Sequence, residues 1–117
     1  MEVGVDIVEI ARIRSIYERY GATFMNKVLT AAEAAQCLAK PDPVASLAGR
    51  FAAKEAISKA LGTGIAHGLG WHSIEVLNNE AGKPVVTLRA QHLSCRINLS
   101  ISHDRHSAVA MALVQPL

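Results

Sequence analysis

The sequence predicts an α+β fold in which helices, including a long buried central helix, pack on one side of an antiparallel sheet. Helical periodicity extends from residue 9 to residue 61, whereas residues that favour strands dominate from residue 73 to the end. The strand-like runs of this last third are short and are joined by short polar connections, which favours antiparallel pairing. A length of 117 residues suits one domain, residues 1–117.

The first strand is predicted over residues 2–8 and contains Asp6, a residue type that strands generally avoid. One interpretation is structural, because Asp6 and Glu9 have the spacing of a capping box for the next helix. The other is functional: a carboxylate near the end of a strand is held on a rigid support and faces a ligand. The residues alone leave both interpretations open.

An amphipathic helix is predicted over residues 9–20, and Gly21 should end it. One side of this helix carries Arg12, Ile16 and Arg19, a basic stripe with an apolar residue that the core does not use. Such a stripe is either a solvated face or a docking surface for an acidic partner helix.

Two further helices are predicted before residue 62. The capping box Thr30-Ala31-Ala32-Glu33 opens a short helix to about Ala39. A long helix then runs from residue 43 or 44 to residue 61, and Gly62 has the position of a C-terminal cap. Because apolar residues lie on nearly every side of the long helix, it should be largely buried.

Two charged residues of the long helix, Glu55 and Lys59, lie on a stripe of small apolar side chains. They form either a simple ion pair one turn apart or a place where a carboxylate is stabilised by a hard metal ion. The pattern does not choose between them.

The last third contains four predicted strands, residues 73–77, 84–88, 97–102 and 108–114, and the first strand should join their sheet. The glycine-rich residues 62–70 before them match no phosphate-binding motif and are predicted to be a flexible connection. His103, at a strand end, is by composition more typical of a structural histidine than of a catalytic one.

Composition excludes several classes of protein. Half of the residues are apolar and 19% are charged, so the chain is not disordered, and no apolar run is long enough for a membrane span. A net charge of +2 with few aromatic residues argues against a nucleic-acid partner. The start of the chain carries no export signal, so we expect a cytoplasmic protein in which Cys37 and Cys95 are reduced.

Four blocks in order, residues 4–10, 49–65, 82–84 and 99–103, closely resemble the small, single-domain bacterial holo-acyl-carrier-protein synthases of the 4′-phosphopantetheinyl transferase family. The resemblance implies that fold and the transfer of 4′-phosphopantetheine from coenzyme A to a serine of an acidic apo acyl carrier protein, in fatty acid biosynthesis. It also implies a homotrimer with its sites at subunit contacts.

The resemblance assigns roles to individual residues. Asp6 and Glu55 would hold Mg²⁺, Glu55 would accept the serine proton, and Lys59 would assist at the phosphate. The docking surface for the carrier protein would be Arg12, Ile16 and Arg19. The coenzyme A site would include the following residues: Arg50 and His103 near the 3′-phosphate, Lys54, Gly62 and Gly64 along the cofactor, and Gly82, Lys83 and Pro84 on the adenine side.

Two features depart from the family pattern. Asp104 places an acid next to His103, and residues 89–98 are shorter than the usual segment before the last hairpin. The alternatives to fatty-acid synthesis are a transferase for carrier domains of polyketide or other secondary pathways, and a catalytically silent module that binds coenzyme A or a carrier protein.

Overall fold

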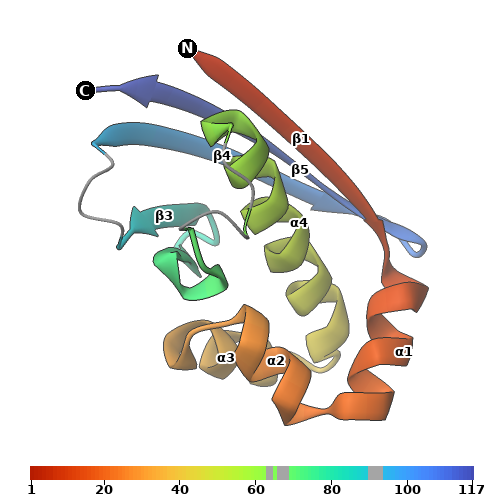
Figure 1. Cartoon of the computed structure of the whole chain (residues 1–117). Helices are drawn as coiled ribbons and strands as arrows, with labels where there is room; N and C mark the ends of the chain where they lie inside the picture. The colour runs from red at the N-terminus through yellow and green to blue at the C-terminus, as the bar shows by residue number, and fades with distance from the viewer. Residues whose placement is uncertain (63–64, 66–68, 90–93) are drawn as a thin grey trace.

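The computed structural model describes residues 1–62, 65, 69–89 and 94–117. The described elements follow in this order: β1 (Glu2–Glu9), α1 (Ile10–Tyr20), α2 (Ala22–Val28), α3 (Ala31–Leu38), α4 (Pro43–Leu61), a 3₁₀ turn (Trp71–Ser73), β2 (Ile74–Asn78), β3 (Pro84–Leu88), β4 (Cys95–His103) and β5 (Ser107–Pro116) (Figure 1). The predicted α+β class is confirmed. The short helix α2 was not predicted from the sequence.

The strands form two antiparallel sheets. A three-stranded sheet has the order β1-β5-β4, so the first and last strands of the chain pair with each other, as predicted for β1. The strands β2 and β3 form a separate two-stranded hairpin, and the expectation of one sheet was wrong for them. The hairpin lies on the other side of α4 from β1 (Figure 1).

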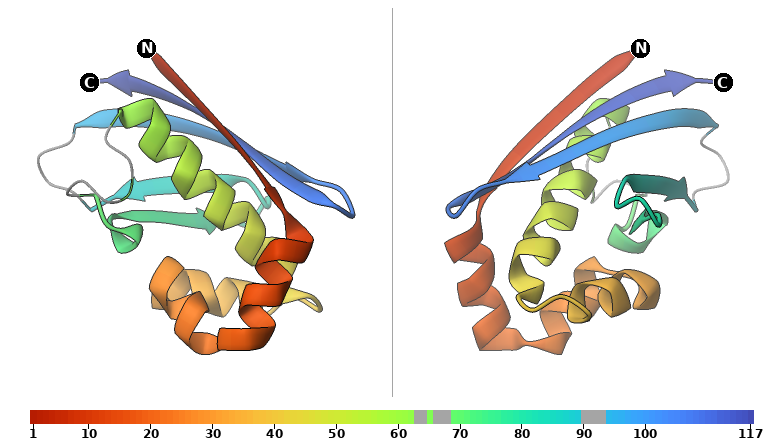
Figure 2. Two further views of the ribbon diagram at one scale, coloured as in Figure 1. Left: turned by 45° about the vertical axis from the view of Figure 1, so that its right-hand side comes forward. Right: turned by 180° about the vertical axis from the view of Figure 1, so that it is seen from behind.

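The central helix α4 packs across one face of the three-stranded sheet. Seen from behind, the opposite face is covered by none of the described elements (Figure 2). The contact is close because it is built from small residues. A Cβ on Gly4 of β1 would lie 1.9 Å from the Ala56 carbonyl oxygen of α4, so only glycine fits there. Ala52 and Ala56 of α4 and Ala108, Ala110 and Ala112 of the central strand β5 are fully buried between the helix and the sheet.

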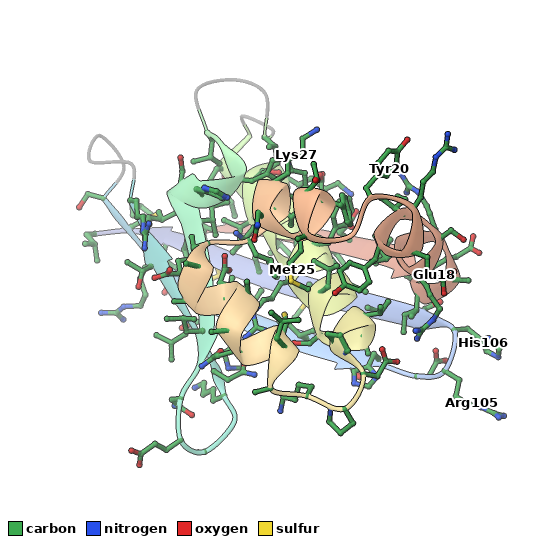
Figure 3. All side chains as sticks on the ribbon, turned by 90° about the horizontal axis from the view of Figure 1, so that it is seen from below. Glu18, Tyr20, Met25, Lys27, Arg105 and His106 are labelled. Atoms are coloured by element: carbon green, nitrogen blue, oxygen red, sulfur yellow. The ribbon has the colours of Figure 1, made fainter. Side chains whose placement is uncertain are left out.

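Helices α1, α2 and α3 gather at one end of α4 (Figures 1 and 2). Met25 of α2 points into the core, whereas Glu18 and Tyr20 of α1 point outward (Figure 3). The capping box predicted at the start of α3 is confirmed, with reciprocal bonds between Thr30 and Glu33. The long helix ends as predicted, with Gly62 in the left-handed conformation at φ 77°.

The alternative capping box, Asp6 with Glu9, is wrong. Asp6 lies inside β1, the strand continues to Glu9, and no side chain caps α1. The strand extends further because Glu9 still pairs with Ser107 of β5. The carboxylate of Asp6 is therefore not occupied by the helix end.

The face of the sheet opposite α4 is apolar along β1 and β5, whereas β4 presents Asn98, Ser100 and Ser102 there. Val3, Val5 and Ile7 of β1 and Met111 of β5 are exposed there, and Val109 and Leu113 are half-buried. In the described part of the chain, no helix has both the length and the hydrophobicity that crossing a membrane requires.

Candidate active site

The carboxylate of Asp6 lies next to α4 because side chains alternate along β1. Gly4, Asp6 and Val8 face the helix, whereas the residues between them face away. Since Gly4 allows the two backbones to approach, Asp6 reaches the stripe of α4 that carries Glu55 and Lys59. We refer to Asp6, Glu55 and Lys59 as the carboxylate cluster.

Among the described residues, Lys59 forms an ion pair with Asp6 and none with Glu55. Its Nζ lies 2.8 Å from Asp6 Oδ1 and also donates to the Val5 carbonyl oxygen at 3.2 Å. The interpretation as a simple pair between Glu55 and Lys59 along the helix is therefore wrong. The Asp6 side chain is only 16% exposed, whereas that of Lys59 is 54% exposed and has room to move.

Glu55 lies half-buried beside this pair. Burial raises the pKa of the Glu55 carboxyl above its ordinary value, and the negative charge of Asp6 raises it further. The positive charges of Lys59 and Arg12 act in the opposite direction. Two carboxylates thus lie within electrostatic range of each other, in a place where additional positive charge is favourable.

This donor set fits a magnesium ion. Mg²⁺ prefers oxygen ligands, and in phosphate-transferring sites it is usually held by one or two carboxylates together with substrate phosphates and water. The described residues contain no group of three or more metal-binding side chains, so the remaining ligands would have to come from substrate and water. Lys59 shows that a cation is accommodated at Asp6.

A cavity of about 540 Å³ lies between α4, the β2–β3 hairpin and the end of β4. Four residues predicted to bind coenzyme A line it: Arg50, Gly82, Pro84 and His103. The sequence did not identify Lys40, Ser46 and Asn78, which also line it. Lys40 stands alone before Pro41, and no motif marks it as a binding residue. The cavity therefore combines cationic side chains with a wall made of the hairpin.

The cavity and the carboxylate cluster lie at opposite edges of the sheet. Asp6 of β1 and Ile101 of β4, which lines the cavity, are both in register with Ala110 of the central strand. They are thus two strand spacings apart, about 10 Å. Around α4, Glu55 and Arg50 point about 140° apart at 3.6 residues per turn. One subunit presents its cluster and its cavity on different sides of the helix.

Lys54 does not reach the cavity. Its side chain is fully buried, and its Nζ donates to the carbonyl oxygens of Val28 and Trp71 and to Glu33 Oε1, at 2.7 to 2.8 Å. An ammonium group has three donors, and all three are used. We expected Lys54 to border the cofactor, but in the structure it joins elements of the core instead.

Two other residues predicted to contact coenzyme A, Lys83 and Gly62, are not among the described residues that line the cavity. Lys83 lines a separate depression, beside the outer face of the sheet, with Met111 and Leu113. Gly62 is the cap of α4, and Gly64 and part of the short segment 89–98 lie outside the described residues.

His103 is exposed at the rim of the cavity, and its neighbour Asp104 has a structural function. Asp104 Oδ1 accepts hydrogen bonds from the backbone N–H groups of His106 and Ser107, both at 2.8 Å, and these bonds lower the pKa of the Asp104 carboxyl. Asp104 thus closes the β4–β5 turn, whose tip carries Arg105 and His106 (Figure 3). The hydrogen bonds that Asp104 accepts in this turn thus account for an acidic residue next to His103.

The basic stripe of α1 adjoins the carboxylate cluster. Arg12 and Arg19 are exposed and Ile16 is half-buried, and the guanidinium of Arg19 lies 5.4 Å from the centre of the Tyr20 ring. Arg12 lies within electrostatic range of Glu55, since its positive charge lowers the pKa of the Glu55 carboxyl. Arg14 is outside the stripe and forms an ion pair of 2.7 Å with Asp42, the N-cap of α4.

Comparison with known proteins gives one consistent result. A family model described as the 4′-phosphopantetheinyl transferase superfamily matches residues 2–114. Holo-(acyl-carrier-protein) synthases from Chlorobaculum parvum and Chlorobaculum tepidum are 83% and 74% identical, covering 100% and 99% of both chains.

Solved structures agree with the sequence comparison. A holo-(acyl-carrier-protein) synthase from Bacillus anthracis, in complex with CoA (3′,5′-ADP), has a TM-score of 0.89 at 36% identity over 99% of this chain and 96% of that one. The enzyme from Helicobacter pylori, in complex with coenzyme A, has a TM-score of 0.88 at 35% identity over 97% and 99%. The chain described here therefore belongs to the 4′-phosphopantetheinyl transferase superfamily, among the phosphopantetheinyl transferases of the holo-(acyl-carrier-protein) synthase type.

Proposed function

We propose that this protein transfers the 4′-phosphopantetheine arm of coenzyme A to a serine hydroxyl of an apo acyl carrier protein and releases adenosine 3′,5′-bisphosphate. The observation that carries the proposal is the carboxylate cluster, in which the fold brings Asp6 to Glu55 and Lys59 from a distant part of the chain. Family membership and the relatives with bound coenzyme A support the choice of donor.

Asp6 and Glu55 would hold Mg²⁺, since they supply the oxygen ligands that this ion prefers. When bound, the ion would supply positive charge next to the oxygens of the pyrophosphate. The proposal does not depend on further protein ligands, because phosphate oxygens and water complete such a coordination shell.

Glu55 is the proposed general base. Its carboxylate is half-buried beside Asp6 and Lys59, and a carboxylate at this position suits removal of the serine proton. The serine oxygen then bonds to the β-phosphorus, the bond from that phosphorus to the bridging oxygen breaks, and the bridging oxygen leaves with the adenosine bisphosphate. Lys59 is exposed enough to turn from Asp6 toward the charge that develops on the leaving group.

The cavity would bind the nucleotide end of coenzyme A. Lys40 and His103 supply the charge and hydrogen-bond donors that suit the 3′-phosphate, and Gly82 and Pro84 would border the adenine. The same proposal assigns Lys83, which lies outside this cavity, and the glycines Gly62 and Gly64 to other parts of the coenzyme.

The proposed assembly is a homotrimer. Its support is the uncovered apolar face of the sheet, where Val5 is 55% and Ile7 67% exposed. A coenzyme A site shared between subunits also agrees with the placement of cluster and cavity on different sides of one subunit, because the cluster of one copy could then face the cavity of the next.

The proposed partner is an acidic apo acyl carrier protein of fatty acid synthesis, acting in the cytoplasm. The stripe of Arg12, Ile16 and Arg19 offers exposed positive charge with an apolar centre, which complements an acidic amphipathic helix. Its position beside Glu55 would bring the carrier serine to the proposed base.

The test is a transfer assay read by intact mass. Purified protein, coenzyme A, Mg²⁺ and an apo carrier protein should give a carrier heavier by one phosphopantetheine arm, and a chelator should stop the reaction. Asp6→Ala and Glu55→Ala should abolish transfer while far-UV circular dichroism stays that of the parent protein. Exposed Glu80→Ala, in the β2–β3 turn, is the control that should keep activity.

Other outcomes separate the alternatives. Transfer to polyketide-type carriers but not to a fatty-acid carrier would move the protein to a secondary pathway. Coenzyme A binding by calorimetry without mass gain on any carrier would identify a silent binding module. If Asp6→Ala kept near-normal turnover at limiting magnesium, Asp6 would not be a ligand.

A further inference from the structure

The strand β2 forms part of one wall of the cavity, yet only one of its edges is paired. It pairs with β3, and on its other side no strand lies next to it in the described residues. Asn78 at its end lines the cavity, as do Gly82 and Pro84 beyond it. The main sheet therefore supplies no hydrogen-bonded neighbour to the open edge of β2.

Side chains of α3 and α4 occupy the open edge of β2. Glu33 Oε2 accepts a hydrogen bond from the Val76 N–H at 2.8 Å, and Arg50 Nε donates to the Val76 carbonyl oxygen at 2.9 Å. Val76 is fully buried, so water does not compete for these groups. Both backbone groups of Val76 on this side are satisfied by side chains.

Two residues further along, a single side chain repeats this arrangement. The Gln36 carboxamide accepts from the Asn78 N–H at 2.9 Å and donates to the Asn78 carbonyl oxygen at 3.1 Å. Exchange of both hydrogen bonds at alternate residues is the pattern of an antiparallel strand. Glu33, Gln36 and Arg50 thus take the place of a neighbouring strand.

Arg50 has little capacity left for another ligand. Besides Val76, its guanidinium donates to Gln36 Oε1 at 2.6 Å, to Ser46 Oγ and to Cys37 Sγ. An arginine has five N–H donors, and four are engaged here. The residue is only 3% exposed, although it lines the cavity. An arginine that binds a phosphate directly would instead direct several free N–H donors into the cavity.

A second layer of contacts fixes Glu33, one of the three residues at the open edge of β2. Lys54 Nζ binds Glu33 Oε1 at 2.7 Å, which directs the other carboxylate oxygen of Glu33 toward Val76. The Lys54 side chain is fully buried and fully bonded. The network therefore connects the core of α4 to the wall of the cavity.

We propose that Glu33, Gln36 and Arg50 are positioning residues, which hold the open edge of β2 and thereby fix the wall against which the nucleotide end of coenzyme A binds. Arg50 acts through Val76 and Gln36 and is not the ligand of the 3′-phosphate. This inference rests on the proposed function, since that function assigns the cavity to coenzyme A.

The experiment compares two donors, coenzyme A and 3′-dephospho-coenzyme A, which lacks only the phosphate in question. Initial rates are measured for the parent protein, Gln36→Met and Arg50→Lys, with His103→Ala as the comparison at the rim and Asn26→Ala as the control for loss of an exposed carboxamide outside the cavity. Gln36→Met keeps the side-chain volume, so the variant should fold. Hydrogen exchange at the Val76 and Asn78 amides is followed in parallel.

Positioning predicts that KM rises for both donors by the same factor, about 10-fold in Gln36→Met and up to about 100-fold in Arg50→Lys, because small misplacements of a binding group have effects of this size. The value of kcat stays within about twofold, whereas partial unfolding would lower kcat and leave KM unchanged. Exchange at Val76 and Asn78 accelerates in both variants, and Asn26→Ala matches the parent in every measurement.

A direct phosphate contact predicts the opposite. If Arg50→Lys weakened use of coenzyme A while the dephospho form was used as well as by the parent protein, Arg50 would be a ligand and the proposal would be overturned. Unchanged exchange at Val76 and Asn78 in Gln36→Met would also overturn it. Failure of the parent protein to transfer at all would count against the proposed function alone, and the two donors would then be compared by calorimetric Kd.

Discussion

At the scale of single residues, the structure separates charged side chains that are close in sequence. Lys54 and Lys59 both lie on α4, but Lys54 is enclosed in the core and Lys59 is largely exposed beside Asp6. Burial lowers the pKa of the Lys54 ammonium, and Glu33 opposes that effect. Lys54 therefore joins elements of the core, whereas Lys59 keeps an exposed charge beside Asp6.

Glu55 gives a prediction for stability as a function of pH. Its pKa is higher in the folded protein than the ordinary value of 4.5. The folded state then binds more protons than the unfolded state in the range just above 4.5, so this contribution to stability is complete below that pH and is lost as the pH rises through the folded pKa. Ionised Glu55 destabilises the metal-free protein at neutral pH.

We expect Glu55→Gln to unfold at a higher temperature than the parent protein at pH 7 in a chelator. The gain should be at most about 1 kcal/mol because the half-exposed carboxylate is partly screened by water. The difference should disappear below pH 4.5, and added Mg²⁺ should stabilise only the parent protein. Differential scanning fluorimetry from pH 4 to pH 8 measures this, with Glu80→Gln as control; a gain that persisted in acid would contradict it.

At the scale of elements, the contact between β1 and α4 determines the site. The strand brings Asp6 and the helix brings Glu55 and Lys59, and these side chains meet only because the backbones are unusually close at Gly4. Small residues at this crossing therefore decide which charged side chains meet, although none of them carries a charge itself.

We expect Gly4→Ala to lower both stability and activity. The new Cβ would lie 1.9 Å from a backbone oxygen of Ala56, which cannot turn away as a side chain can, so α4 must shift from the sheet. Overpacking of this kind typically costs about 1–3 kcal/mol. Urea unfolding gives the stability, and turnover per folded molecule gives the activity.

The matched control for this substitution is Gly70→Ala. A Cβ at Gly70 would lie 3.8 Å from Ser73 Oγ, an ordinary contact. This variant should resemble the parent protein in both measurements. A Gly4→Ala protein with parental stability would show that the strand and helix adjust without cost.

At the scale of the whole molecule, one chain presents an apolar sheet face, a carboxylate cluster and a cavity in different directions. A chain of this size has little volume for a deep cleft of its own. Association of copies through the sheet would remove the exposed apolar surface from water and would also allow one copy's cluster to face another copy's cavity.

Mixed oligomers test whether the site is shared. Asp6→Asn impairs the cluster and His103→Ala the cavity, so each homo-oligomer should be weakly active. After co-expression, about one quarter of the contacts in a randomly mixed closed ring should combine an intact cluster with an intact cavity. We therefore expect about one quarter of the parental activity, measured after size-exclusion chromatography.

Two results would contradict a shared site. The mixture could show only the average of the two variants, which would place cluster and cavity in the same subunit. Val5→Glu, which puts a charge on the exposed apolar face, should dissociate the oligomer and abolish transfer; full activity as a monomer would exclude the shared site.

The sequence by itself determined the helices with clear signals and the residue types of the site. The capping box at Thr30, the glycine after α4 and the strand-favouring residues of the last third are local patterns, and local hydrogen bonds and backbone preferences decide them. The blocks around Asp6, Glu55 and Lys59 indicated the family, and the comparisons confirmed it.

Only the tertiary structure decided what each of these residues faces. Periodicity shows which side chains share a side of a helix, but the partner comes from another element: Asp6 for Lys59, Glu33 for Lys54, and Val76 for Arg50. The separation of the β2–β3 hairpin from the main sheet could not be predicted from the sequence for the same reason. Strand preference does not say which strand lies next to another. Pairing across long chain separations depends on packing of the whole core, and no local pattern records it.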